Sequence, residues 1–180
     1  MKEKNQNHKI DLVRNLKNNL KKKFYLVLII ISIVQISYGQ HIAIPFQDAE
    51  KQGISIKHLD SIYKNAVNTD TSLAIFKTDT EQEKLQQSYT KLLKDLGNFL
   101  SKNNFKWEKK TPCFNKVYFN YDGAIDYFLY VFTGKAEDKP SDARQKEFQR
   151  LLNLFINDYK FSLKANTKFT QCGGGMYMPE

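Results

Sequence analysis

Two cysteines and three histidines are the residues of this chain best suited to nucleophilic or metal chemistry. Four of them lie beyond the first 39 residues: His41, His58, Cys113 and Cys172. A zinc site needs three or four ligands at suitable spacing, and the chain contains neither a Cys-x-x-Cys nor a His-Glu-x-x-His pattern. The residues therefore predict no metal site and no cofactor.

Cys113 with His58 as its base would give a thiol enzyme or a small envelope hydrolase, since a thiolate attacks once a base removes its proton. No local signature supports this pair, and His58 within Lys57-His58-Leu59-Asp60 is typical of a helix surface. The chain also lacks GxGxxG, P-loop and GxSxG patterns. Enzyme activity through Cys113 or His58 stays an alternative hypothesis, and the residues favour a protein without catalysis.

Cys113 and Cys172 form an even pair, which in an exported domain predicts a disulfide bond. That bond would close a loop of about 60 residues and contribute roughly 4 kcal/mol in the chain-entropy model. The alternatives are two buried free thiols, or one reactive thiol.

The first 39 residues have the layout of a secretory signal peptide, cleaved before Gln40. Eight basic and two acidic residues accompany an apolar run at residues 24–36, and small residues follow at Ser37 and Gly39. The run is shorter than the roughly 20 apolar residues that a membrane span needs. We expect a periplasmic or secreted protein. The alternative is an inner-membrane protein anchored by residues 24–36.

Net charge argues against nucleic acid as the partner. The whole chain holds 28 basic and 19 acidic residues, and without the leader 20 and 17 remain, a net charge of +3. Nucleic-acid binding needs a basic face on the folded part rather than a basic leader. Membrane contact is expected only through the N-terminal segment before cleavage.

Two shorter amphipathic segments predict helices. The first follows Ser55, with apolar residues at three-to-four spacing as far as Val67. The other opens at Ser141 and runs to about Asp158, with a buried stripe at Phe148, Leu151, Leu152, Phe155 and Ile156.

The longest helix is predicted to follow a capping box, in which the Thr80 hydroxyl and the Glu83 carboxylate each accept from the other residue's backbone amide. Its apolar stripe runs from Leu85 to Leu100, and Asn103-Asn104 is expected to end it because Asn tolerates the left-handed conformation.

Asp122-Gly123 predicts a β-hairpin between residues 116–120 and 124–132. A three-residue loop with Gly123 in the left-handed conformation pairs Asn120 with Ala124 and Phe119 with Ile125. This register places six residues on one face: Val117, Phe119, Ile125, Tyr127, Leu129 and Val131. Four aromatic residues then share the opposite face, which is either covered by the helix from Thr80 or a candidate partner surface: Tyr118, Phe128, Tyr130 and Phe132.

These elements predict an α+β fold with N-terminal helices, an antiparallel β-hairpin, a further helix and C-terminal strands. Residues 40–172 are expected to form a single domain, and the glycine-rich residues 173–180 a flexible tail.

Residues 114–172 run from a strand through an Asn-Tyr-Asp-Gly turn to a strand, a loop, a helix and a strand. This order resembles the C-terminal domain of TonB-like energy-transducing envelope proteins. The resemblance implies partner binding through a sheet edge, but not energy transduction, because the chain has no Pro-rich periplasm-spanning linker. We therefore predict a non-catalytic macromolecular interaction module, with another envelope protein as its partner.

Overall fold

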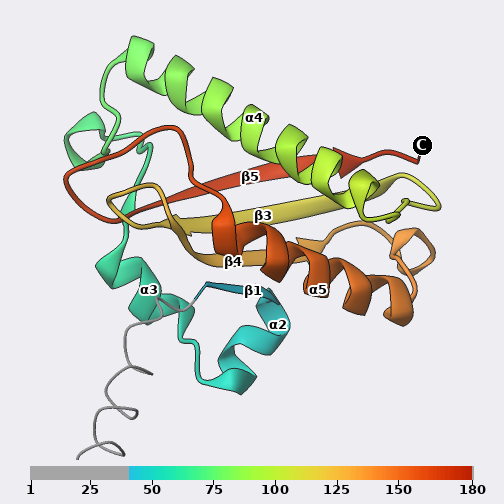
Figure 1. Cartoon of the computed structure of the whole chain (residues 1–180). Coiled ribbons are helices and arrows are strands. Elements are labelled where there is room, and N and C mark those ends of the chain that lie inside the picture. The colour runs from blue at the N-terminus through green and yellow to red at the C-terminus, as the bar shows by residue number, and fades with distance from the viewer. Residues whose placement is uncertain (1–40, 180) are drawn as a thin grey trace, which may run out of the picture. The chain divides into compact units, whose positions relative to one another are not determined.

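A computed structural model describes residues 41–179 (Figure 1). The predicted signal peptide, and the alternative anchor at residues 24–36, lie outside these residues. None of the helices in residues 41–179 is both long and apolar enough to cross a membrane. The helices are α2 (Phe46–Ala49), α3 (Ile56–Ile62), α4 (Asp79–Lys102) and α5 (Asp142–Asp158), with short 3-10 turns at Glu50–Gln52, Thr71–Leu73 and Ala136–Asp138.

The predicted α+β class is confirmed by a mixed five-stranded sheet of order β1-β4-β3-β5-β2. The three central strands are antiparallel, while β1 runs parallel to β4 and β2 runs parallel to β5. The prediction of N-terminal helices is wrong in that the described chain opens with a strand. The strands are β1 (Ile42–Pro45), β2 (Lys64–Asn65), β3 (Thr111–Phe119), β4 (Ile125–Phe132) and β5 (Phe169–Tyr177).

Helices cover both faces of this sheet (Figure 1). Helices α4 and α5 bury their apolar stripes against one face in the larger core cluster. Helices α2 and α3 cover part of the other face in a smaller cluster. Each of the three central strands therefore has apolar side chains that pack against a layer of helices. An α+β domain removes its apolar surface from water in this way.

Helix α4 begins two residues earlier than the sequence predicts. The capping box is Thr78 with Glu81: the Glu81 amide donates to Thr78 Oγ1 over 3.2 Å, and the Thr78 amide donates to Glu81 Oε2 over 3.0 Å. Thr80 lies inside the helix. Glu81 also accepts from the Lys77 amide over 2.9 Å, a second bond that favours the earlier start. Asn103 caps the other end as predicted, and Asn104 has a φ of 58°.

The two shorter helices start where the sequence predicts. Ser141 caps α5, and all five residues of its predicted stripe are buried. Ser55 caps α3, but this helix ends at Ile62 rather than near residue 67. The chain instead turns extended at Tyr63, because the next two residues pair with β5 as β2.

The hairpin loop is the predicted one. Gly123 has a φ of 87°, its amide donates to Asn120 O over 3.0 Å, and the Asn120 amide donates to Ala124 O over 2.8 Å. Phe119 pairs with Ile125, also as predicted. The next pair is Tyr118 with Tyr127, so Asp126 is the extra residue of a β-bulge.

This bulge makes the predicted faces wrong from Tyr127 onward, since one extra residue exchanges the two faces of a strand. Phe128, Tyr130 and Phe132 share the face of Val117 and lie in the larger core with α5. Tyr118 packs on the opposite face, with Leu129 in the smaller core and Tyr127 packed against it.

The prediction of a candidate partner surface is therefore wrong for its four residues, Tyr118, Phe128, Tyr130 and Phe132. These side chains retain between 0 and 6% of their exposure. Phe148 of α5 covers two of them, with ring centroids 5.1 Å from Tyr130 and 5.6 Å from Phe132. All four residues belong to the core.

The predicted flexible tail is wrong for residues 173–177, which continue β5 and pair with β3 as far as Tyr177. Gly173 and Gly175 face α4. A Cβ at Gly173 would lie 2.6 Å from the Tyr89 ring, and one at Gly175 would lie 3.7 Å from Leu93 Cδ1. Glycine at position 173 therefore lets the helix approach the strand closely.

Candidate functional site

The outer edge of β5 is paired only at its beginning. Strand β2 takes two backbone bonds there, from the Lys64 amide to Lys168 O (3.1 Å) and from the Ala66 amide to Thr170 O (2.9 Å). Beyond Thr170, no strand of residues 41–179 pairs with this side of β5. We call the unpaired side of residues 171–177 the β5 edge.

Strand alternation determines which backbone groups face outward at this edge. Residues 168 and 170 direct their carbonyls to β2, so the even-numbered residues of β5 face away from β3. Cys172, Gly174 and Met176 therefore present their amides and carbonyls outward. Gln171 covers one of these groups, because its Nε2 donates to the Cys172 carbonyl over 2.8 Å.

The β5 edge lacks the usual devices that stop a free strand from pairing. Proteins protect such edges with prolines, bulges or charged side chains, above all lysine. Residues 171–177 read Gln-Cys-Gly-Gly-Gly-Met-Tyr and contain none of the protecting residue types. The β5 edge therefore carries no residue of the types that block a further strand from pairing.

A pocket of about 400 Å³, with both apolar and polar side chains in its wall, lies beside the far end of the β5 edge, between the strand and the second half of α4. We call it the α4–β5 pocket. Its lining includes Leu93 and Gly97 from α4, and Met176 and Tyr177 from β5. Trp107 stacks on Tyr177 with ring centroids 4.6 Å apart, so this end of β5 is held against the core. Met176 keeps 55% of its exposure.

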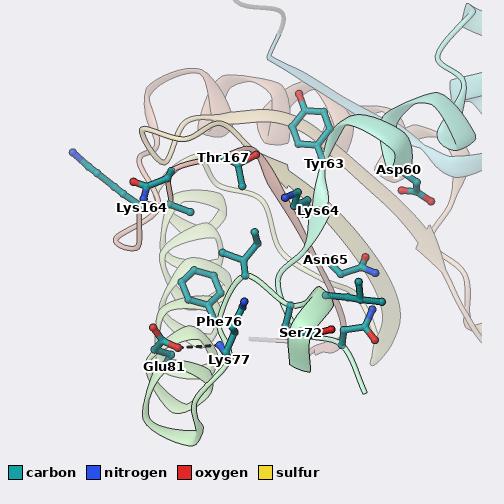
Figure 2. A pocket seen from close by; sticks show the side chains of 16 residues that line it. Asp60, Tyr63, Lys64, Asn65, Ser72, Phe76, Lys77, Glu81, Lys164 and Thr167 are labelled. Atoms are coloured by element: carbon teal, nitrogen blue, oxygen red, sulfur yellow. Dashed lines mark hydrogen bonds between the residues drawn. The ribbon is translucent and has the colours of Figure 1, made fainter. Parts of the chain in front are cut away.

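A second, polar pocket of about 670 Å³ lies at the other end of β5 (Figure 2). Lys64, Lys77 and Lys164 line it, and Lys164 extends outward, away from the other labelled side chains. Its two acidic residues are engaged elsewhere: Asp60 pairs with Lys116 over 2.6 Å, and Glu81 caps α4. Neither a cysteine nor a histidine lines this pocket. The pocket therefore presents positive charge but no nucleophile with a base.

The bulge residue Asp126 organises a buried polar cluster near this pocket. Its carboxylate accepts from Tyr63 Oη over 2.6 Å, from Lys168 Nζ over 2.9 Å and from Asn120 Nδ2 over 3.3 Å. Burial first, and then the adjacent Asp126 carboxylate, hold the pKa of Tyr63 far above its ordinary value. The cluster ties the end of α3 to β4 and the start of β5, and its groups are already hydrogen-bonded to one another. We interpret it as structural.

The predicted disulfide is wrong. Cys113 and Cys172 are free thiols on neighbouring strands, but in the β3–β5 register Cys113 lies opposite Gly175, and Cys172 lies opposite Lys116. Cross-strand partners share a face, and residues three apart along a strand point to opposite faces. Cys113 is buried under the helices, while Cys172 is exposed on the other face of the sheet.

The pairing of Cys113 with His58 is also wrong. His58 belongs to α3, on the face of the sheet opposite the Cys113 side chain. Burial raises the pKa of the Cys113 thiol to about 12, which keeps it protonated at neutral pH. His41 is engaged with the Ile125 carbonyl at 2.6 Å. Within residues 41–179, no three His, Cys, Asp or Glu side chains gather closely enough to hold a metal ion.

The β5 edge is missing from the sequence-based prediction because three consecutive glycines are typical of a flexible tail. The available signal is their position, because the predicted C-terminal strands lead directly into the glycines and Met-Tyr follows them. An apolar ending of this kind indicates a strand that continues into the core.

Comparison of the chain with protein-family models, with curated proteins and with solved structures finds no match.

Proposed function

We propose that this protein is a non-catalytic interaction module that binds an extended segment of another envelope protein along the β5 edge. The observation that carries the proposal is the unprotected edge at Cys172, Gly174 and Met176, whose backbone groups face away from β3. Strand addition of this kind derives its affinity from main-chain hydrogen bonds. The glycines help, because a partner backbone meets no side chain at Gly174, where a Cβ would have nothing within 4 Å.

The bound segment would pair with the same side of β5 as β2 does, beyond the point where β2 ends. The partner would accept from the amides of Cys172, Gly174 and Met176 and donate to their carbonyls. At Cys172 the partner amide would replace the Gln171 side chain, which occupies that carbonyl in the free protein. The exchange costs little, because one hydrogen bond replaces another.

The test uses the protein as isolated after export and a phage-displayed library of random twelve-residue peptides. Gly174→Pro removes an outward amide and fills the edge with a ring, but it leaves the bonds to β3 in place. Gly174→Ala is the matched control, since it keeps the amide. We expect selected peptides to bind Gly174→Pro at least tenfold more weakly than wild type, and Gly174→Ala nearly as well as wild type.

The proposal is overturned if no peptide is enriched, or if enriched peptides bind Gly174→Pro as they bind the wild type. It is also overturned if sedimentation shows a wild-type dimer that Gly174→Pro dissociates, because a second copy would then occupy the edge. Thermal midpoints of the two variants within a few degrees of each other establish that both are folded.

We also propose that the chain is exported, cleaved before Gln40 and released to the periplasm or beyond. The basic leader, the short apolar run and the small residues Ser37 and Gly39 support this. Intact-mass analysis of the exported protein should give a chain that begins at Gln40. Recovery of all 180 residues in the membrane fraction would instead establish the anchor at residues 24–36.

A further inference from the structure

Gly97 has no packing role within the described chain. It lies well inside α4, a helix of 24 residues, where glycine is the poorest helix former after proline. A Cβ added at Gly97 would meet nothing within 4 Å, so no neighbouring atom among residues 41–179 requires a glycine there. Gly97 instead lines the α4–β5 pocket, where the missing side chain leaves the space open.

The α4–β5 pocket lies where a strand on the β5 edge would place side chains. Gly175 and Tyr177 face α4, and Gly175 is within contact distance of Leu93 in the pocket wall. Side chains of neighbouring strands that share a face lie about 5 Å apart. A strand added beside Gly175 and Tyr177 would therefore direct every second side chain toward this pocket.

The rim of the pocket carries one positive charge. Lys94 is exposed there and forms no ion pair with any side chain of residues 41–179. Its neighbour Asp95 is already engaged, with Lys91 Nζ at 2.6 Å and with Tyr159 Oη at 3.0 Å. An acidic residue of a bound segment would therefore meet a cation that forms no ion pair within residues 41–179, although its charge also acts on Asp95.

We infer that the α4–β5 pocket selects the partner: it takes a large apolar side chain of the bound segment, and Lys94 pairs with an acidic residue two positions away. The spacing follows because residues i and i+2 of a strand share a face. This inference rests on the proposed binding at the β5 edge, and it specifies the chemistry of the segment as apolar-x-acidic.

The experiment repeats the selection from the same peptide library on pocket variants. Gly97→Leu fills the open space with a good helix former, so the fold should be unchanged or more stable. Peptides selected on the wild type should share the apolar-x-acidic pattern and bind Gly97→Leu at least tenfold more weakly. Gly97→Ala is the matched control, since a methyl group restores helix propensity while leaving most of the pocket open.

Charge reversal tests the second half of the inference. Selection on Lys94→Glu should enrich a basic residue where the wild type enriches an acidic one. Lys84→Glu reverses an exposed lysine on the same helix about 15 Å away, at 1.5 Å per residue, and should leave the acidic preference unchanged.

The outcomes separate this inference from the proposed function. If Gly174→Pro abolishes binding but Gly97→Leu and Lys94→Glu select wild-type peptides with wild-type affinity, the edge binds and the pocket does not select. If Gly174→Pro has no effect, or no peptide is enriched, both proposals are overturned.

Discussion

Asp126 determines which face each residue of β4 presents. Residues 124–132 are apolar or aromatic at every position except Asp126. Either face of the predicted strand could therefore be buried, and the alternation of residue types could not locate a bulge. The buried carboxylate is stable in the bulge because Tyr63 and Lys168 reach it there. Both partners are distant in sequence, which is why the hairpin loop could be predicted while the faces beyond it could not.

Gly123 should not tolerate a side chain. Its φ is 87°, and an added Cβ would lie 2.5 Å from the Phe161 carbonyl oxygen. We expect Gly123→Ala to lower the free energy of unfolding by about 2 kcal/mol or more, measured by urea denaturation. Gly53→Ala is the control: its φ is 79° but its Cβ would meet nothing within 4 Å, so only the backbone cost of about 1 kcal/mol should appear. Equal losses in the two variants would contradict the clash with Phe161.

The two thiols should differ strongly in reactivity. Cys172 is exposed, whereas Cys113 is buried and burial raises its pKa to about 12. A thiol reagent at pH 8 should modify one cysteine rapidly in the native protein and the second only on unfolding, and Cys172→Ser should remove the rapid phase. Absence of any free thiol before reduction would contradict the β3–β5 register.

At the scale of elements, the helices were more predictable than the strand that forms the candidate site. The stripes of α4 and α5 are periodic over several turns, and a local pattern of that length is sufficient to predict an amphipathic helix. Strand β5 depends on α4 instead: Gly173 fits because Tyr89 packs directly above it. A glycine that is required by a distant helix cannot be distinguished from a flexible one by its neighbours in sequence.

The start of α4 gives a test that separates two neighbouring threonines. Thr78→Ala removes the N-cap hydroxyl and should lower the free energy of unfolding by about 1 kcal/mol. Thr80→Ala replaces an exposed residue inside the helix with a better helix former, and should leave stability unchanged or slightly raised. Urea denaturation of both variants decides the matter. A larger loss in Thr80→Ala would move the capping box back to Thr80 and Glu83.

At the scale of the whole molecule, pairing between distant segments completes the sheet. Strand β1 runs parallel to β4, more than 80 residues away in sequence, and β2 extends the sheet by only two residues beside β5. Residues 42–45 are too few to show a reliable alternation, so the sequence pattern alone could not assign them to the sheet. The β5 edge could not be predicted for the same reason, because it is unpaired only beyond the point where the two-residue strand β2 ends.

Acid should weaken the fold through carboxylates that connect distant segments. Lys160 holds the pKa of Asp122 below its ordinary value of 3.8, and the Ala124 amide adds to this effect. The ion pair, 2.6 Å between Lys160 Nζ and Asp122 Oδ2, joins the hairpin loop to the segment after α5. Because the folded pKa is lowered, the stabilisation is present above the ordinary value and is lost as the pH falls through the folded value.

We therefore expect Asp122→Asn to lower the free energy of unfolding at pH 7 by a few tenths of a kcal/mol, a small effect because both side chains are partly exposed. The difference from wild type should shrink as the pH falls below the ordinary value of 3.8, and it should vanish once the carboxyl is protonated in the folded state as well. Asp158→Asn, which changes an exposed carboxylate without an ion pair in residues 41–179, should leave the pH dependence as in the wild type. A difference at Asp122 that stayed constant as the pH was lowered would mean that the side chain acts through its shape in the loop rather than through its charge.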